Sequence, residues 1–297
     1  PRPGGRGPRM ARWCVAGAAG MRGQDRCAVL EDAGHVVTRG DLPGLDILDP
    51  AQCAEQVAGH DVVVNCAAYT AVDAAESDEA RAFAVNAVGA ANLATAAERA
   101  GAAMVQISTD YVVAGSGDEP YAADAPVAPA SAYGRTKAAG EWAVRANCSR
   151  SWIVRTAWLY GAGGKNFPAT MQRLAGERET LTVVADQVGQ PTWTVDLAEA
   201  IVRIVDAGAP FGIWHGTSSG ECSWFDLARA VFEELGLDPQ RVTPIATEDF
   251  PLPAPRPAYS VLSHDMWETA GVQPLPHWRD ALHRSAPTVL APRTRSV

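Results

Sequence analysis

Short runs of apolar residues recur through the first half of the chain, and longer stretches with helical spacing separate them. The runs lie at residues 12–16, 35–38, 61–65, 103–107 and 151–155. A short run that does not alternate between polar and apolar residues is typical of a strand buried on both faces of a parallel sheet. Strands that alternate with helices predict an α/β fold with a Rossmann-type doubly wound parallel sheet.

The pattern changes after about residue 160. Here we expect helices over residues 167–178, 196–207 and 223–235, a strand over 182–185, and an extended proline-rich loop over 250–257. Ligands of open α/β sheets bind outside the carboxyl ends of the strands. We therefore expect these later elements to cover that edge and to form the substrate side.

Composition excludes two classes of partner. The net charge is −9 and no basic run interrupts the acidic balance, which argues against a nucleic-acid surface. No apolar stretch approaches the ~18 residues that a membrane span needs. The six cysteines are scattered singly, which indicates reduced thiols in a cytoplasmic protein.

The first apolar run ends in a glycine-rich turn. Gly17, Gly20 and Gly23 enclose Met21 and Arg22, and a stretch compatible with a helix follows. Glycines let the backbone approach a pyrophosphate, which the N-terminus of the following helix then stabilises. A tight strand-to-helix turn also occurs without a ligand, so the glycine spacing by itself leaves that plainer interpretation open.

The second run ends at Arg39. In dinucleotide sites an acidic residue tends to follow this strand when the cofactor is NAD, whereas an arginine accommodates the 2′-phosphate of NADP. Arg39, together with Arg22, therefore favours NADPH. Because Asp41 lies nearby, NADH stays open as the cofactor.

These patterns divide the chain into four parts. They are a disordered extension over residues 1–9, a NAD(P)-binding Rossmann domain over 10–165, a mainly substrate-binding region over 166–285 with helices that return to the Rossmann core, and a flexible tail over 286–297. The first part is rich in proline, glycine and arginine and cannot build a core, and the last part has a similarly loose character.

A tyrosine and a lysine four positions apart carry the candidate chemistry. Tyr133 and Lys137 fall in a helix-compatible stretch, where residues four apart lie on one face. A free tyrosine titrates near ~10, and one charge at ~4 Å, at an effective dielectric of ~20, supplies the roughly 4 kcal/mol that would bring its pKa to about 7. Thr109, at the end of the fourth run, adds a hydroxyl. We therefore predict a proton donor to a carbonyl, built from Thr109, Tyr133 and Lys137.

Lysine is rare in this chain. There are two, Lys137 and Lys165, against twenty-three arginines. Where nearly every other cation is arginine, a lysine indicates a need for a compact point charge that a guanidinium cannot meet. A solvated lysine one turn below a packed tyrosine is the alternative, and this motif alone leaves the two interpretations about equal.

Further segments resemble one family. They lie at residues 44–49, 64–73, 108–111, 155–161, 166–167, 186–192, 220–224 and 256–260. With the glycine turn and the Tyr133–Lys137 pair, they extend over nearly the whole chain. The chain resembles the extended short-chain dehydrogenases/reductases. More narrowly, it is similar to the dTDP-4-dehydrorhamnose reductases and the related 4-ketoreductases of antibiotic deoxysugar pathways.

The resemblance implies a reductase that passes a hydride from NAD(P)H to carbon 4 of a dTDP-4-keto-6-deoxyhexose. Tyr133 would protonate the forming alkoxide, Lys137 would lower the pKa of Tyr133 and hold the nicotinamide ribose, and Thr109 would hydrogen-bond the carbonyl oxygen. The expected cofactor contacts, besides Tyr133 and Lys137, are Gly17, Gly20, Met21, Arg22, Gly23, Arg39, Asp46, Ile47, Ala67, Ala68, Tyr69 and Thr70. The expected substrate contacts are Thr109, Asp110, Trp158, Asn166 and Arg256.

Two other functions occur on the same scaffold. One is a regulatory subunit that binds a nucleotide without turnover, and the presence of Thr109, Tyr133 and Lys137 together argues against it. The other is an epimerase or dehydratase. Dehydratases of this type typically follow the catalytic threonine with an Asp-Glu pair, whereas Asp110 is followed here by Tyr111.

Some members of this family dimerise through Mg²⁺ held by acidic residues. Asp25 and Asp196 are candidate counterparts, but no complete set is evident, so we predict no metal ligand and leave a need for Mg²⁺ open. A monomer and a homodimer both stay open. The expected partner is a dTDP-sugar, and the sequence fixes neither the configuration produced at carbon 4 nor the deoxysugar pathway.

Overall fold

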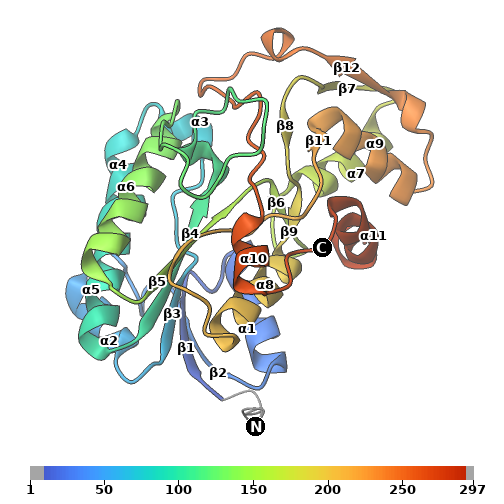
Figure 1. Cartoon of the computed structure of the whole chain (residues 1–297). Coiled ribbons are helices and arrows are strands. Elements are labelled where there is room, and N and C mark those ends of the chain that lie inside the picture. Colours follow the sequence, from blue (N-terminus) through green and yellow to red (C-terminus); the bar gives the residue numbers. More distant parts are fainter. Residues whose placement is uncertain (1–9, 292–297) are drawn as a thin grey trace.

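Six parallel strands form one sheet at the centre of the molecule (Figure 1). The computed structural model describes residues 10–291. The strand order is β10-β5-β4-β3-β1-β2, with β1 (Arg12–Ala16), β2 (Val36–Gly40), β3 (Val62–Asn65), β4 (Ala103–Thr109), β5 (Ser151–Thr156) and β10 (Gly212–His215). The chain starts at β1 and winds outward in both directions, so the predicted Rossmann-type doubly wound fold is confirmed.

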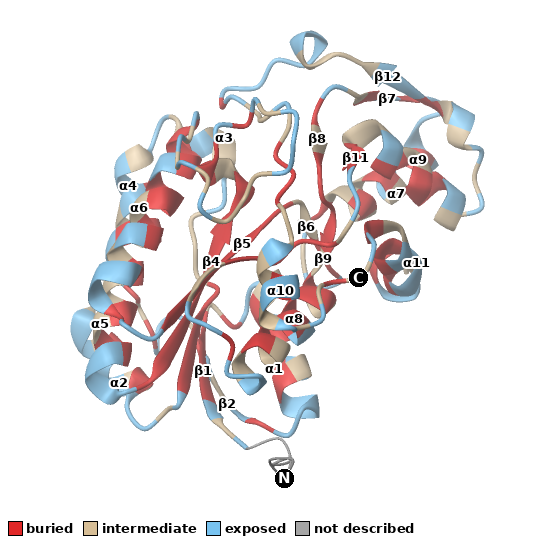
Figure 2. Ribbon diagram, viewed as in Figure 1, coloured by how far each residue is buried: buried red, intermediate tan, exposed pale blue. Residues whose placement is uncertain are grey.

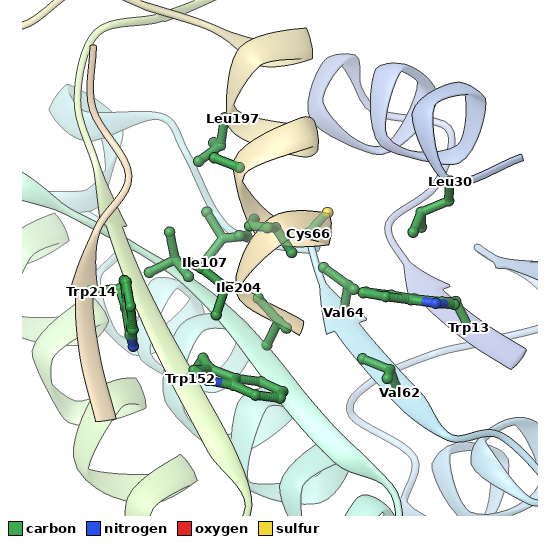
Figure 3. Close-up of a cluster of buried hydrophobic side chains, with 14 of the residues drawn as sticks. Trp13, Leu30, Val62, Val64, Cys66, Ile107, Trp152, Leu197, Ile204 and Trp214 are labelled. Atoms are coloured by element: carbon green, nitrogen blue, oxygen red, sulfur yellow. The ribbon is translucent and has the colours of Figure 1, made fainter. Parts of the chain in front are cut away.

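Helices cover both faces of the sheet. On one face lie α1 (Met21–Asp32), α8 (Thr194–Asp206) and α10 (Asp265–Ala270), and on the other lie α2 (Pro50–Val57), α5 (Ala90–Ala100) and α6 (Ala132–Asn147). Alternate side chains of β1 enter different cores: Trp13 belongs to the apolar cluster that contains Leu30 and Leu197 (Figure 3), whereas Cys14 belongs to the one that contains Leu93. Such two-sided burial explains why the strands appear as continuous apolar runs.

Three neighbouring strands of the sheet are the most enclosed. Every residue of β3, β4 and β5 is buried (Figure 2). The link between β3 and β4 contains α3 (Val72–Ala75), α4 (Glu79–Phe83) and a π-helical turn (Ala84–Gly89) that runs into α5. This alanine-rich stretch thus forms a series of short helical segments that ends in α5.

A smaller region lies beside the carboxyl edge of the sheet (Figure 1). Its helices are α7 (Phe167–Glu177), α9 (Trp224–Glu234) and α11 (Trp278–Val289). Its short strands pair as β6 (Leu159–Tyr160) with β9 (Thr192–Trp193), β7 (Leu181–Val184) with β12 (Val242–Ile245), and β8 (Val188–Gly189) with β11 (Cys222–Ser223). One apolar cluster, which includes Tyr160, Leu227 and Leu282, holds these elements together.

The sequence pattern missed several late elements. β10, α10 and α11 had no counterpart among the expected elements, and the flexible tail was expected from residue 286. That expectation is wrong at its start, because α11 continues through Pro287 to Val289 and Leu290 is buried. Burial against the rest of the cluster outweighs the weak helical pattern there. The calls on residues 1–9 and 292–297 lie outside the described residues, and the division of the chain at residue 165 stays a prediction.

Within residues 10–291, none of the helices combines the length and the apolar character needed to cross a membrane.

Candidate active site

A cavity of about 920 Å³ opens at the carboxyl ends of β1, β3, β4 and β5. This edge is where open α/β sheets bind their ligands. The expected site residues that line the cavity are Gly17, Gly20, Met21, Arg22, Gly23, Asp46, Ile47, Ala67, Ala68, Thr70, Thr109, Asp110, Tyr133 and Trp158. The expected residues that do not line it are Arg39, Tyr69, Lys137, Asn166 and Arg256.

The glycine turn packs backbone against backbone. Gly17 has a φ of 77°, which favours glycine, and a Cβ there would lie 2.6 Å from the amide nitrogen of Ala67. A Cβ on Gly23 would lie 2.2 Å from the carbonyl oxygen of Gly17. Gly20 is the N-cap of α1 and supplies no side-chain cap. The start of this helix is therefore left open at the cavity, in an arrangement that suits a phosphate group.

Arg39 does not line the cavity, and its expected cofactor contact stays a prediction. Its Nη2 donates to both carboxylate oxygens of Glu31 in α1, at 2.8 and 2.9 Å, on the exposed surface. The side chain thus faces the helix and not the cavity. Asp41, two residues later, does line the cavity, and its Oδ2 accepts a 2.5 Å hydrogen bond from the amide of Ala19.

Tyr133 lies in the cavity wall and is only 7% exposed. Its ring meets the Tyr111 ring edge-on, with the ring centroids 5.6 Å apart. Burial raises the pKa of the Tyr133 phenol above its usual value, while the charge of Arg22 and a hydrogen bond with Thr109 act in the opposite direction. The phenol is therefore protonated, which is the state that a proton donor needs.

Lys137 lies one turn further along α6. Its Nζ donates a 2.6 Å hydrogen bond to the carbonyl oxygen of Ile107 in β4. Burial, and to a smaller extent the charge of Arg22, lower the pKa of Lys137 to about 7. The sequence argument, in which this cation alone brings the pKa of Tyr133 near 7, is therefore wrong here. It omitted desolvation, which raises the pKa of a phenol and lowers that of an ammonium.

A buried ion pair lies one turn beyond Lys137 on α6. Arg155 of β5 donates through Nε and Nη2 to the two carboxylate oxygens of Glu141, at 2.9 and 2.8 Å. The two side chains are 1% and 2% exposed. Ser108, the residue before Thr109, donates a 2.5 Å hydrogen bond to the same carboxylate. The pair therefore ties α6 to β4 and β5 next to the cavity.

Asp110 follows Thr109 and is buried in a short 3₁₀ turn (Asp110–Val112). Its two oxygens accept from different hydroxyls: Thr109 Oγ1 donates at 2.9 Å and Ser260 Oγ donates at 2.6 Å. Burial raises the pKa of Asp110 to about 6, although both hydroxyls lower it. Ser260 falls in a segment that carried the family resemblance, but sequence reasoning gave it no role.

This raised pKa makes stability depend on pH. A carboxyl that titrates near ~3.9 in the unfolded chain and at about 6 in the fold favours folding in its neutral form. Its contribution is complete below about pH 4 and is lost as the pH rises through 6. We expect Asp110→Asn to gain about 2 kcal/mol of stability relative to the unmodified protein as the pH rises from 4.5 to 7. Urea unfolding of both proteins across this range measures the difference, and parallel curves would contradict it.

Two of the expected substrate contacts, Asn166 and Arg256, form hydrogen bonds outside the cavity. Asn166 caps α7, accepting from the amide of Ala169 at 2.9 Å, and its Nδ2 donates to the carbonyl oxygen of Gly161 at 2.7 Å. Arg256 donates to both carboxylate oxygens of Asp73, at 2.7 and 2.8 Å. Asn166 and Arg256 do not line the cavity and their polar groups have partners outside it, so their expected substrate contacts stay predictions.

Tyr69 is also held away from the cavity. Its amide donates to Asn86 Oδ1 at 2.9 Å, and Asn86 Nδ2 donates back to the carbonyl oxygen of Tyr69 at 3.2 Å. The backbone of Tyr69 thus positions the neighbouring Ala68 and Thr70, which do line the cavity. Tyr69 itself does not line the cavity, and its expected cofactor contact stays a prediction.

Other cavity residues escaped the sequence analysis. Arg81, Lys165 and Trp224 line the cavity, although none of them was among the expected site residues. The scarcity of lysine was a usable signal for Lys165. Trp224 belongs to a segment of the family resemblance, whereas Arg81 comes from the alanine-rich helices and nothing in the sequence marks it.

Neither candidate acid for Mg²⁺ lies in a metal-binding cluster. Asp25 accepts a hydrogen bond from Thr194 Oγ1, and Asp196 is paired with Arg284. Among residues 10–291 there is no group of three or more histidine, cysteine, aspartate or glutamate side chains that could hold a metal ion.

Known proteins similar to this chain share its full length. The family model described as “RmlD substrate binding domain” matches residues 11–290. A Streptomyces griseus protein named dTDP-4-dehydrorhamnose reductase is 48% identical over 293 residues, which cover 96% of each chain. This chain belongs to the dTDP-4-dehydrorhamnose reductase family. The family that the sequence motifs indicated is thereby confirmed.

Two further members of the family extend the comparison. A Streptomyces niveus protein named dTDP-4-keto-6-deoxy-D-glucose reductase is 47% identical over 283 residues, covering 94% of this chain and 98% of that protein. The solved dTDP-4-dehydrorhamnose reductase of Bacillus anthracis, in complex with NADP, has a TM-score of 0.88 and 37% identity, covering 93% of this chain and 99% of its own. The family's fold therefore matches that of this chain in both of its regions.

Proposed function

We propose that this protein uses NADPH to reduce the 4-keto group of a dTDP-4-keto-6-deoxyhexose, as a dTDP-4-dehydrorhamnose reductase or a related dTDP-deoxysugar 4-ketoreductase. The observation that carries the proposal is a single cavity whose wall contains the glycine turn, Thr109 and Tyr133. Relatives that match nearly the full chain bear the names of such reductases, and a solved relative is in complex with NADP.

The residues of the glycine turn suit a nicotinamide dinucleotide. Gly17 and Gly23 leave no room for side chains, so the backbone itself forms the cavity wall. Gly20 leaves the first amides of α1 to a pyrophosphate, which the helix N-terminus also favours electrostatically. NADPH, when bound, supplies a hydride for the ketone carbon of the substrate.

Tyr133 donates the proton that completes the reduction. As carbon 4 receives the hydride, the phenolic proton moves to the ketone oxygen, so the product is a secondary alcohol and the tyrosine becomes a phenolate. Arg22 stabilises that phenolate, since its charge already lowers the pKa of Tyr133. We assign Lys137 to the ribose hydroxyls of the cofactor, which its ammonium reaches by giving up the carbonyl oxygen of Ile107.

Thr109 is the second donor to the ketone oxygen. Its hydroxyl donates here to Asp110 and would exchange that acceptor for the substrate. A donor aimed at the oxygen where negative charge develops stabilises the transition state more than the bound ketone. Thr109 therefore holds the ketone oxygen by a hydrogen bond, and Tyr133 protonates it.

The position of Arg22 predicts its effect on the cofactor. Arg22 lines the cavity at the start of α1, whereas Arg39 is held by Glu31 on the surface. Removing a cation that contacts a phosphate costs roughly 1.5–3 kcal/mol, so we expect Arg22→Ala to raise the Kd for NADPH by about tenfold or more. Titration of cofactor binding by fluorescence or calorimetry measures this change.

Arg39→Ala provides the matched control. It removes the same charge from the next strand, and we expect the Kd for NADPH to change by no more than about twofold, since an exposed ion pair contributes little. If both variants lose affinity for NADPH equally, Arg39 also contacts the cofactor. If neither variant loses affinity, Arg22 does not contact the cofactor.

A direct assay tests the proposed function. The purified protein, supplied with a dTDP-4-keto-6-deoxyhexose and NADPH, should consume one NADPH per ketone and give a product reduced at carbon 4. Analysis of the product by NMR identifies its configuration. Conversion of the sugar nucleotide without NADPH consumption would instead indicate an epimerase or dehydratase, and cofactor binding without any conversion would indicate a regulatory protein.

We further propose a cytoplasmic location for this activity. All six cysteines of the chain lie within the described residues, and each is buried and unpaired. Unpaired thiols throughout a chain of this size fit a reducing compartment.

A further inference from the structure

Trp158 has an unusual backbone conformation. Its φ is 46°, and no other residue of the described chain (10–291) has a positive φ except glycines. For a bulky residue this region is strained, and the strain persists only where the surroundings over-determine it. Residues of this kind cluster at ligand sites and active sites. The question is what holds Trp158 in place.

Two neighbours, Trp224 and Gly189, fix the indole of Trp158. Trp224 stacks on it with ring centroids 3.5 Å apart and an interplanar angle of 8°. Phe167 supports Trp224, with their ring centroids 4.7 Å apart. A Cβ on Gly189 would lie 2.6–2.8 Å from three atoms of the Trp158 indole, so only glycine leaves the ring its place. The Trp158 indole is therefore clamped between the Trp224 ring and the backbone of β8.

Trp224 is itself firmly placed. It is the first residue of α9, directly after the N-cap Ser223. Ser223 Oγ accepts from the amide of Asp226 at 3.1 Å, and Asp226 Oδ2 accepts from the amide of Ser223 at 3.0 Å, which completes a capping box. Both tryptophans line the cavity. Their stack thus joins the segment that follows β5 to a helix of the smaller region.

This stack lies next to the reacting centre. Thr109 at the end of β4 pairs with Thr156 at the end of β5, and Trp158 is two residues further on. Neighbouring strands are ~4.8 Å apart. A hexose whose ketone is held by Thr109 and Tyr133 therefore extends across the end of β5 to Trp158. Trp224 and Gly189 take up the two sides of this indole, so the hexose would contact the part of the ring that lines the cavity.

We propose, on the basis of the function proposed above, that Trp224 is a positioning residue that determines which face of the ketone receives the hydride. It acts through Trp158. By stacking on this indole, Trp224 holds it in one orientation. The indole in turn fixes the orientation of the hexose beside the cofactor. A hexose that can tilt or turn over presents the other face of carbon 4, and the reduction then gives the other epimer.

The test compares products as well as rates. We expect Trp224→Ala to lower the ratio of the two carbon-4 epimers by about tenfold, because an aromatic pair is worth up to ~1.5 kcal/mol. The KM for the sugar nucleotide should rise by about tenfold while the KM for NADPH stays within about twofold. Trp224→Phe keeps a flat ring and should retain most of the epimer ratio. NMR of the product and steady-state kinetics supply these values.

A second variant reaches the same indole without touching Trp224. Gly189→Ala places a methyl group where it would clash with the Trp158 ring. It should therefore reproduce the loss of epimer ratio expected for Trp224→Ala. Far-UV circular dichroism reports on the stack directly, since two stacked indoles give an exciton couplet. That couplet should disappear in Trp224→Ala and persist in Trp142→Ala, which removes an exposed tryptophan of α6.

Each outcome is decisive. An unchanged epimer ratio and sugar KM in both Trp224→Ala and Gly189→Ala overturn the inference. If Trp224→Ala does not fold, the result for Gly189→Ala decides alone. The unmodified protein in the same assay tests the proposed function separately. If it gives no 4-reduced sugar nucleotide, the proposed function is wrong. If it is active and the variants have the same epimer ratio and sugar KM, only the role of Trp224 is wrong.

Discussion

Replacing Tyr133 with phenylalanine should lower kcat by about 10²- to 10⁴-fold, the usual contribution of a positioned proton donor. The reason is local. Tyr133 is buried in the cavity wall with a raised pKa, so it holds its proton until the ketone oxygen gains charge. Phenylalanine keeps the ring and its edge-on contact with Tyr111. The Kd for NADPH should therefore stay within about twofold, because the lost hydroxyl acts on the transition state. Single-turnover rates and cofactor titration measure the two quantities.

Tyr160→Phe is the matched control for this change. Tyr160 is also buried, but it belongs to the apolar cluster of the smaller region and does not line the cavity. Losing its hydroxyl should leave kcat within about twofold. A Tyr133→Phe enzyme with normal turnover would show that the proton comes from elsewhere. An equal loss in both variants would show that the effect comes from the fold and not from proton donation.

The sequence was most informative where local geometry and chemistry demand the same residues. Gly17 and Gly23 can be recognised because a backbone that packs against another backbone tolerates no side chain. Thr109 and Tyr133 meet at the cavity because one ends a buried strand and the other begins a helix beside it. Such features depend on a few neighbouring positions, so their spacing survives in the sequence.

The sequence was least informative about contacts between residues that lie far apart in the chain. Arg39 pairs with Glu31 and Arg256 with Asp73, and only the fold reveals which carboxylate each guanidinium contacts. Trp224 reaches the cavity from a helix 66 residues after Trp158 in the chain. The pKa of Lys137 depends on its burial, which cannot be obtained from the four-residue spacing to Tyr133.

Breaking the buried ion pair should cause the largest loss of stability. Arg155→Met leaves the Glu141 carboxylate buried, with Ser108 as its one remaining hydrogen-bond donor among the described residues. Removing one partner of a buried pair costs about 3–5 kcal/mol. The double variant Glu141→Gln/Arg155→Met removes both charges and should recover much of this loss, since a buried neutral amide costs less than a buried unpaired charge. Urea unfolding, analysed with a common slope, gives the free energies of unfolding.

The surface pair Arg135–Glu79 shows what the same contact contributes in water. It is also bidentate, at 2.9 and 3.0 Å, yet both side chains are more than 40% exposed, so Arg135→Met should cost no more than about 1 kcal/mol. Similar losses in the two single variants would mean that burial does not set the cost. The double variant could instead be as unstable as Arg155→Met. In that case Arg155 stabilises the fold through its packing between β5 and α6, and not as the counter-charge of Glu141.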